Sequence, residues 1–377
     1  MTHQKKVGPA LVDFQLRDLI GQGCINGISP DDVQPASIDL RAKKIWATSY
    51  RPNPEEFDPA AFIQDAALEP AFTDAQIEKG ITLTLGRAHS YLVLLDGTLN
   101  LPAGISGGAS PKSSIGRIGA DCAVLVGTGG REFNSIPIGY RGPLYLVMAP
   151  QTFPLDLRSG VALAQLRLFE GNRDFLAPRD LALMCNNYNV VHRDDDVEPT
   201  INEEGVLCHV DLSGPMPNLV AARRGKKLPL WGEGEADPTE YFAIKSLDHG
   251  DTLILEPGQF ALVRTIERLR VTEFLCAEMV AHREEQGHVT THRAGYGDPG
   301  FGYGRGEHTG NRFICELRNF GVDAVAIKQG SPICVIRYMY TQYAAQNPYS
   351  VLRQSHYQEQ EEQIKIAKFF APWPVAA

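Results

Sequence analysis

The chain has 377 residues, of which 43% are hydrophobic, and a formal net charge of −9 at pH 7. This length allows two domains with separate cores, and the hydrophobic fraction excludes a chain that is disordered throughout. The acidic balance argues against a general nucleic-acid-binding protein, which would present a basic surface to phosphates. No apolar run approaches the ~20 residues of a membrane helix, and the start has no uninterrupted apolar region typical of a signal peptide, so we expect a cytoplasmic protein.

Short apolar runs predict a mainly β protein. The 36 glycines and 25 prolines divide the chain into runs such as residues 91–95, 122–127 and 333–340. This pattern is typical of strands joined by many turns. The seven cysteines are scattered and form no CxxC pair. Neither a disulfide framework nor a cysteine zinc site is indicated, and we expect the cysteines to be small buried hydrophobes.

In chain order, the first predicted element is a short helix over residues 11–23, which ends at a glycine. A strand over residues 34–46 follows. Residues 50–80 are rich in proline and acidic side chains, so we expect an irregular insertion there. Near the C-terminus, residues 355–370 are polar with weak helical periodicity and indicate an arm rather than a core element.

An internal repeat organises the chain. The apolar positions and turns of residues 81–105 match those of residues 251–275. Residues 144–169 match residues 313–339 in the same way, with one extra residue in the second copy. Both pairs are offset by about 170 residues, which indicates a tandem duplication.

The segment between the two copies indicates the domain boundary. Residues 191–205 are acidic and lack apolar periodicity, which is typical of a linker. We place the boundary near residue 195. The prediction is therefore an N-terminal module of residues 1–195 and a C-terminal module of residues 196–377.

A candidate phosphate-binding segment lies in the first half, in the sequence SPKSSIGRIG of residues 110–119. The hydroxyls of Ser113 and Ser114 and the cations of Lys112 and Arg117 lie in one glycine-flanked stretch. Hydroxyls, backbone N–H groups and fixed positive charges together suit a phosphate group. Taken alone, the segment is also typical of a polar surface turn.

A glycine-rich turn in the second half, AGYGDPGFGYG at residues 294–304, surrounds Asp298. Its carboxylate could accept a hydrogen bond from a sugar hydroxyl. Asp-Pro-Gly sequences also form ordinary β-turns in which the residues serve conformation alone. Both interpretations remain open for this motif by itself.

The sequence RFICELRNF, residues 312–320, predicts a strand with an acid in its middle. Alternation places Phe313, Cys315 and Leu317 on one face and Ile314, Glu316 and Arg318 on the other. On this pattern alone Glu316 would be a solvent-facing residue, since half-buried strands carry charge on their wet face.

Comparison of the two copies favours a functional interpretation of both motifs. The position that matches Glu316 in the first half is Val147, so the strand accepts an apolar residue there. The position that matches the Lys-Ser-Ser sequence falls near Arg283 and Glu285, where carboxylates would repel phosphate. Each half has what the other lacks. The pattern predicts one composite site with a phosphate cradle from the first half and an acid from the second.

Four motifs together resemble those of dCTP deaminases in the dUTPase-like superfamily, and in particular the double-length bacterial members. They are QPASIDLR (34–41), KSSIGRIG (112–119), DPGF (298–301) and ICELRN (314–319). The resemblance covers most of the chain apart from residues 50–80. It implies tandem duplicated modules of a distorted jelly-roll β-barrel with a few short helices, and active sites between neighbouring modules.

The resemblance also implies roles for individual residues. Glu316 would be the catalytic acid and base, Asp298 would bind the sugar, and the closing C-terminal arm would reach the substrate. His356 stands where the family has a lysine, and Arg293 is the nearest match to a family arginine before the turn. The implied substrate-binding residues are Lys112, Ser113, Ser114, Arg117, Arg293, Asp298, Tyr349, His356 and Gln360.

The chemistry implied by the resemblance is the hydrolysis of dCTP to dUTP and ammonia in pyrimidine deoxynucleotide biosynthesis. This reaction needs a group that takes a proton from water and delivers protons to the ring nitrogen and the leaving amine, which a carboxylate in a partly dry pocket can do. Zinc-dependent deaminases carry HxE and PCxxC motifs, and neither is present here. We therefore expect metal-free water activation by Glu316, no catalytic cofactor, and Mg²⁺ bound with the substrate triphosphate.

The expected partners are small nucleotides, with dCTP as substrate and dTTP as a candidate inhibitor, and no nucleic acid or membrane. We expect a homo-oligomer with one site per chain. Two alternatives remain open. The chain could be a dUTPase or a bifunctional deaminase and dUTPase, although Pro137 stands where such enzymes carry an aspartate and only Asp298 keeps this option. It could also be a catalytically silent nucleotide sensor.

Overall fold

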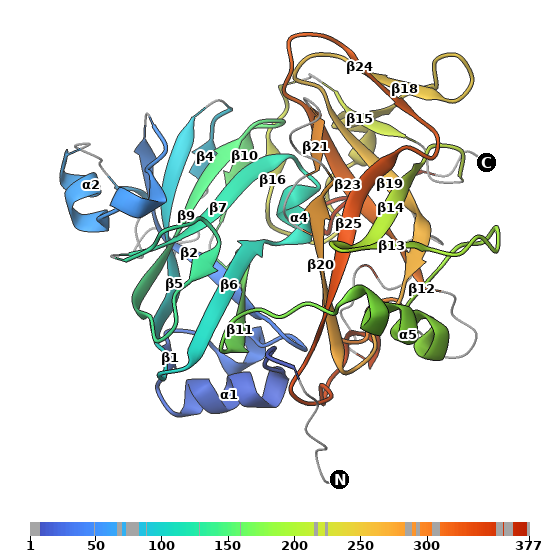
Figure 1. Cartoon of the computed structure of the whole chain (residues 1–377). Coiled ribbons are helices and arrows are strands. Elements are labelled where there is room, and N and C mark those ends of the chain that lie inside the picture. Colours follow the sequence, from blue (N-terminus) through green and yellow to red (C-terminus); the bar gives the residue numbers. More distant parts are fainter. Residues whose placement is uncertain are drawn as a thin grey trace. The chain divides into compact units, whose positions relative to one another are not determined.

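The computed structural model of the chain divides into two compact units (Figure 1). The first unit comprises Pro9–Arg173 and Gly225–Gly232, and the second comprises Met1–Gly8, Asp174–Arg224 and Glu233–Ala377. The structure describes residues 8–48, 50–65, 70–72, 83–87, 89–127, 129–158, 160–214, 218–222, 225–282, 289–291, 295–303, 310–351, 357 and 365–374.

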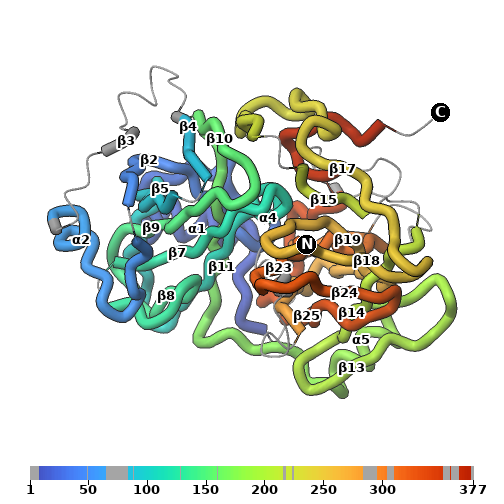
Figure 2. The backbone as a smooth tube through the Cα atoms, turned by 90° about the horizontal axis from the view of Figure 1, so that it is seen from above, coloured from blue at the N-terminus to red at the C-terminus, as the bar shows by residue number. Residues whose placement is uncertain are grey.

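The first unit is built on one large sheet with the strand order β7-β9-β5-β2-β11-β6-β8. A smaller sheet, β16-β10-β4, accompanies it, and β4 and β10 lie side by side in Figure 2. The strands of this unit are β1 (Ile25–Asn26), β2 (Ile38–Thr48), β3 (Pro70–Phe72), β4 (Leu83–Leu85), β5 (Ser90–Asn100), β6 (Ile105–Pro111), β7 (Ala120–Val126), β8 (Ser135–Ile136), β9 (Arg141–Pro150), β10 (Leu155–Leu157), β11 (Ala162–Glu170) and β16 (Leu228–Pro229). Its helical segments are α1 (Asp13–Gly21), η1 (Pro30–Asp32), η2 (Pro54–Glu56), α2 (Pro59–Asp65) and α4 (Ser113–Gly116).

The second unit is also a β structure, with one large sheet and a separate pair of strands, β18 and β24. Its strands are β12 (Val191–His192), β13 (Thr200–Asn202), β14 (Gly205–Asp211), β15 (Leu219–Ala221), β17 (Phe242–Ile244), β18 (Thr252–Leu255), β19 (Phe260–Leu269), β20 (Leu275–Ala281), β21 (Val289–Thr291), β22 (Tyr296–Gly297), β23 (Asn311–Asn319), β24 (Val325–Lys328) and β25 (Pro332–Tyr340). Its helical segments are α5 (Pro178–Tyr188), η3 (Pro238–Glu240) and η5 (Tyr349–Val351).

The same strand order in both units confirms the tandem duplication. The path β7-β9-β5-β2-β11-β6-β8 of the first unit corresponds to the pairings β21-β23-β19-β14-β25-β20-β22 of the second. The pair β4 and β10 corresponds to β18 and β24. The fold is therefore mainly β, with two barrel-like modules of one pattern, as the sequence predicts.

Two local predictions are confirmed and one is wrong. The helix predicted over residues 11–23 is α1, and the strand predicted over residues 34–46 is β2. The insertion predicted to be irregular contains the helix α2, while residues 66–69 and 73–80 lie outside the described residues. Its proline, Pro59, occupies the first helical position, where no intrahelical N–H bond is lost.

The acidic segment 191–205 is not a loose linker, which corrects the sequence-based interpretation. Val191 and His192 form β12, which pairs with the end of β19. Asp194 accepts hydrogen bonds from Arg268 and Arg312, and these ion pairs hold the segment against the second unit's own sheet. The segment is ordered by strand pairing, by burial of Val191 in the core of the second unit and by ion pairs with fixed arginines.

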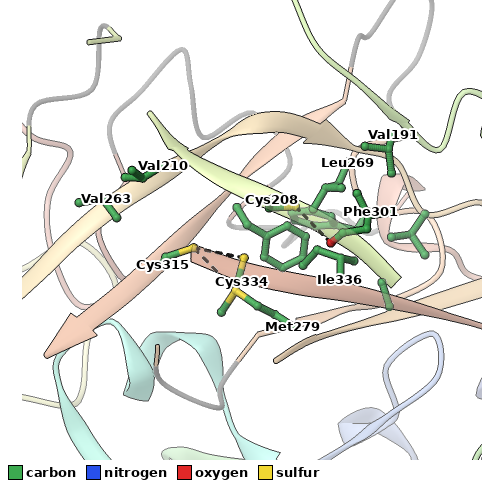
Figure 3. Close-up of a cluster of buried hydrophobic side chains, with 14 of the residues drawn as sticks. Val191, Cys208, Val210, Val263, Leu269, Met279, Phe301, Cys315, Cys334 and Ile336 are labelled. Atoms are coloured by element: carbon green, nitrogen blue, oxygen red, sulfur yellow. Dashed lines mark hydrogen bonds between the residues drawn. The ribbon is translucent and has the colours of Figure 1, made fainter. Parts of the chain in front are cut away.

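The core of the second unit contains a group of sulfur atoms, shown in Figure 3. Cys315 Sγ lies 3.8 Å from both Cys334 Sγ and Met279 Sδ. The hydrogen bond with Cys208 and the burial of the group raise the pKa of the Cys334 thiol well above its usual value. The Cys334 thiol is thus protonated, and Cys208, Cys315 and Cys334 serve as small core residues, as the sequence predicts. Among the described residues, no helix is long and apolar enough to cross a membrane.

Candidate active site

Glu316 lies in the middle of β23 and is only 2% exposed. Its neighbours Cys315 and Leu317 belong to the core cluster of the second unit, so the Glu316 side chain leaves the strand on the opposite face. The prediction about the alternating faces is confirmed. The simple interpretation of Glu316 as a solvent-facing residue is wrong, because this face of the strand is buried as well.

The ladder register confirms that Glu316 and Val147 occupy equivalent positions. Glu316 lies opposite Leu262 on β19, and Val147 lies opposite Leu92 on β5. In the first unit this face carries a hydrophobic cluster of its own, into which part of the insertion packs. The buried members of this cluster, called here the insertion cluster, are Trp46, Phe57, Leu92, Leu125, Tyr145 and Val147, with Phe62 and Ile63 of α2 packed against them.

An alternating chain of charges lies on the same face of β19 and β23 as Glu316. Arg264 donates to Asp211 at 2.6 Å, and Arg312 bridges Asp211 at 3.1 Å and Asp194 at 2.6 Å. Although burial favours the neutral acid, the charge of Arg264 and hydrogen bonds from Ser213 lower the pKa of Asp211 below its usual value. This arrangement keeps ionised groups within the sheet face that carries the candidate acid.

The candidate phosphate segment of the first unit forms the short helix α4 at the end of β6. The Lys112 carbonyl oxygen accepts from the N–H groups of Ile115 and Gly116 at 2.8 and 3.1 Å. Ser114 and Arg117 are buried, and Ser113 is half-buried. Gly119, with a φ of +67°, then turns the chain into β7, a conformation that glycine adopts without strain. The two hydroxyls and Arg117 are therefore held on one compact turn.

Lys112 has an ionic partner on another strand of the same sheet. Its Nζ lies 2.5 Å from Asp39 Oδ1 on β2. Asp39 belongs to the QPASIDLR motif, to which the sequence analysis gave no role in the site. The sequence did contain a signal, because both segments are family motifs. An acid in one motif is a candidate ion-pair partner for a lysine in the other.

The Asp-Pro-Gly turn of the second unit supports the start of the C-terminal segment. The Tyr349 N–H donates to the Pro299 carbonyl oxygen at 2.7 Å, and the Tyr349 ring lies 5.8 Å from that of Phe301. A side chain on Gly300 would come within 2.7 Å of the Tyr349 nitrogen, so this position requires glycine. Asp298 is half-buried at the start of the turn, and its carbonyl oxygen accepts from Phe301 at 3.0 Å.

The Tyr349 phenol is engaged with the chain itself. Its hydroxyl oxygen accepts from the Tyr357 N–H at 3.3 Å, and Asn311 Nδ2 donates to the Tyr357 carbonyl oxygen at 3.0 Å. Asn311, a buried residue of β23 that the sequence analysis missed, thus holds the same segment. Three predicted substrate-binding residues, Arg293, His356 and Gln360, lie outside the described residues.

Comparison with known proteins decides the family. The N-terminal domain of 2′-deoxycytidine 5′-triphosphate deaminase matches residues 9–172, and the C-terminal domain of the same enzyme family matches residues 179–370. The chain belongs to the dCTP deaminase family. The two family domains follow the same order as the two halves of the duplicated β structure.

Individual dCTP deaminases resemble the chain over different lengths. The crystal structure of the 2′-deoxycytidine 5′-triphosphate deaminase from Agrobacterium tumefaciens is 25% identical, with a TM-score of 0.81 over 92% of this chain and 98% of that one. A protein of Methanobrevibacter smithii named dCTP deaminase, dUMP-forming, is 33% identical over 33% of this chain and 62% of its own length. A protein of the same name from Dictyoglomus thermophilum is 30% identical over 42% of this chain and 85% of its own length.

Proposed function

We propose that the chain catalyses the hydrolytic deamination of dCTP to dUTP and ammonia. One observation carries this proposal beyond membership of the family. Glu316 is a buried acid at a ladder position that the duplicate fills with Val147. Burying a carboxyl group is costly, and Val147 at the equivalent position shows that the fold does not require one there. A catalytic proton carrier accounts for its presence.

Glu316 would act as both base and acid in this reaction. Its carboxylate takes a proton from the attacking water as the oxygen bonds to C4 of cytosine. It delivers this proton to the ring nitrogen, then takes the proton of the new C4 hydroxyl and gives it to the amine, which leaves as ammonia while the C4 carbonyl forms. A side chain that is 2% exposed exchanges its proton with few competing waters. We propose that this water activation needs no metal, because the sequence lacks the motifs of zinc-dependent deaminases.

Ser113, Ser114 and Arg117 would hold the triphosphate, and Asp298 would accept from the deoxyribose. The support for the first group is their placement on one compact turn, on which Arg117 is a buried positive charge. Mg²⁺ would accompany the triphosphate as part of the substrate. That residues of both units serve one composite site, that the chain is a homo-oligomer and that dTTP inhibits it remain predictions.

The test is an assay of the full chain with dCTP in which ammonia, pyrophosphate and nucleotide products are measured together. Release of ammonia with dUTP as product supports the proposal. Binding of dCTP without any product would instead support a nucleotide sensor.

A second candidate is a bifunctional enzyme that also cleaves between the α and β phosphates. The names of the relatives from M. smithii and D. thermophilum, which are dUMP-forming, favour it. Against it, Pro137 stands after β8 where such enzymes carry an aspartate. Equal amounts of ammonia, pyrophosphate and dUMP from dCTP would establish this alternative.

A further inference from the structure

A row of polar side chains crosses three strands of the first unit just before α4. Asp39 on β2 lies opposite Gln165 on β11, and Gln165 lies opposite Ser110 on β6. Gln165 Nε2 donates to Ser110 Oγ at 3.4 Å, and both residues are buried. Polar side chains on a buried sheet face are costly unless they are paired, so a row of three needs an explanation.

The equivalent row of the second unit is apolar. Leu207 on β14 lies opposite Val335 on β25, and Val335 lies opposite Val280 on β20. These three residues take the places of Asp39, Gln165 and Ser110 in the duplicate. The fold of the module therefore does not require polar residues at these positions, and they belong to the half that carries the serine and arginine segment.

Lys112 connects the polar row to α4. Its backbone N–H donates to the Leu163 carbonyl oxygen at 3.0 Å, and its ammonium group reaches back to Asp39 at 2.5 Å. The side chains are 22% and 13% exposed. At this exposure the cost of desolvation offsets much of the attraction, so such a pair contributes little net stability but fixes orientation. Because the Lys112 carbonyl accepts the first hydrogen bonds of α4, fixing Lys112 at both ends sets the direction of the helix.

We propose that Asp39 is a positioning residue that acts through Lys112 to orient Ser113 and Ser114 for the substrate triphosphate. The inference rests on the proposed function of these serines. It assigns Lys112 the role of linking Asp39 to α4 rather than that of a substrate contact. Gln165 and Ser110 complete this arrangement by tying the end of β6 to β11, the strand that lies between β6 and β2.

The experiment uses the full chain and the variants Asp39→Asn and Lys112→Met. Each should raise the KM for dCTP about tenfold and leave kcat within about twofold, because the ground-state and transition-state contacts to the phosphates are weakened alike. Binding of inorganic tripolyphosphate, measured by calorimetry, should weaken by the same factor. The double variant should be no worse than either single variant, since both remove the same pair.

Asp32→Asn is the matched control. It removes the ion pair of Asp32 with Arg41, which lies two residues beyond Asp39 on β2 and donates from its guanidinium to the Gly160 carbonyl oxygen. Its KM should equal that of the wild type. If Asp39→Asn does not fold, Asp39→Leu replaces it, because leucine is the residue of the duplicate at this position.

Three results would overturn the proposal. In the first, Lys112→Met raises KM and Asp39→Asn does not, which would make Lys112 a direct contact. In the second, Asp39→Asn lowers thermal stability without changing KM or tripolyphosphate binding. In the third, wild-type protein does not bind tripolyphosphate. Wild-type protein that binds tripolyphosphate but releases no ammonia from dCTP would contradict the deaminase proposal alone, and the binding measurements would still decide the role of Asp39.

Discussion

Two equivalent positions in the duplicated sheet have opposite chemistry. Val147 faces an insertion cluster built by Trp46, Phe57 and other large side chains, whereas Glu316 shares its face with the ion pairs of Arg264 and Arg312. The backbone register around both is the same, since Leu92 and Leu262 lie opposite them. The difference in side-chain chemistry at the two positions therefore reflects the role of each sheet face and not a difference in strand pairing.

A second pair of equivalent positions shows the reverse assignment. The row that leads to α4 is polar in the first unit, with Asp39 and Gln165, and apolar in the second, with Leu207 and Val335. Each unit thus serves as a control for the other. A residue that the fold requires should recur at both positions, and a residue that only chemistry requires should occur once.

The largest effect that we expect is from Glu316→Gln. This variant keeps the size and hydrogen-bonding shape of the side chain but cannot shuttle protons, so ammonia release from dCTP should fall about 10³-fold or more. Binding of dCTP, measured by calorimetry, should stay within about threefold of the wild type, because the amide retains the shape of the pocket. Full activity of this variant would contradict the mechanism.

The next effect concerns stability and exchanges the two residues. Val147→Glu buries an acid among aromatic side chains of the insertion cluster and should lower the free energy of unfolding by about 3 kcal/mol. Glu316→Val, the reciprocal change, should lower it by less, because an apolar residue in place of a buried polar group is often neutral. Urea unfolding measures both variants. An equal or larger loss in Glu316→Val would show that the acid serves the fold.

Arg117→Ala should act on binding. Loss of a charge-assisted contact to phosphate corresponds to about 2 kcal/mol, so KM for dCTP should rise about thirtyfold with a smaller change in kcat. Arg131→Ala, which removes an exposed arginine from the same unit, is the matched control and should leave KM unchanged. An unchanged KM in Arg117→Ala would remove this residue from the site.

The sequence predicted the parts of the fold that depend on periodicity. Alternation identified the core face of β23, and the repeat in apolar positions predicted the duplication that the strand order confirms. Alternation could not show that Glu316 is buried, because it distinguishes the two faces of a strand but not whether the second face is covered. Burial of both faces depends on contacts distant in sequence.

The ion pairs could not be predicted from the sequence. The acidic stretch around Asp194 had the composition of a linker, and the position of Arg268 and Arg312 on neighbouring strands shows what its carboxylates bind. The pairing of Asp39 with Lys112 spans 73 residues of sequence. Charge complementarity over such separations leaves no periodic pattern, so the structure is needed to find it.

The smallest effect that we expect comes from the β-bulges beside the two equivalent strands β2 and β14. In the first unit Asp96 Oδ1 accepts from the Arg41 N–H at 3.0 Å, and in the second Glu267 accepts from the His209 N–H at 2.7 Å. Glu267 also has the His209 ring and Arg193 beside it. Burial, partly offset by the hydrogen bond from Arg41, raises the pKa of Asp96 from 3.8 to about 6.

The raised pKa of Asp96 predicts a pH dependence of stability that this residue contributes. Because the pKa of Asp96 is higher in the folded than in the unfolded chain, protonation favours the folded state, and its contribution rises as the pH falls from about 7 to about 4. Asp96→Asn keeps an acceptor for Arg41 but does not titrate. The stability of the wild type relative to this variant should therefore increase by about 2 kcal/mol between pH 7.5 and pH 4, as measured by urea unfolding at each pH. A constant difference between the two proteins across this range would show that the Asp96 carboxyl is solvated like an ordinary surface acid.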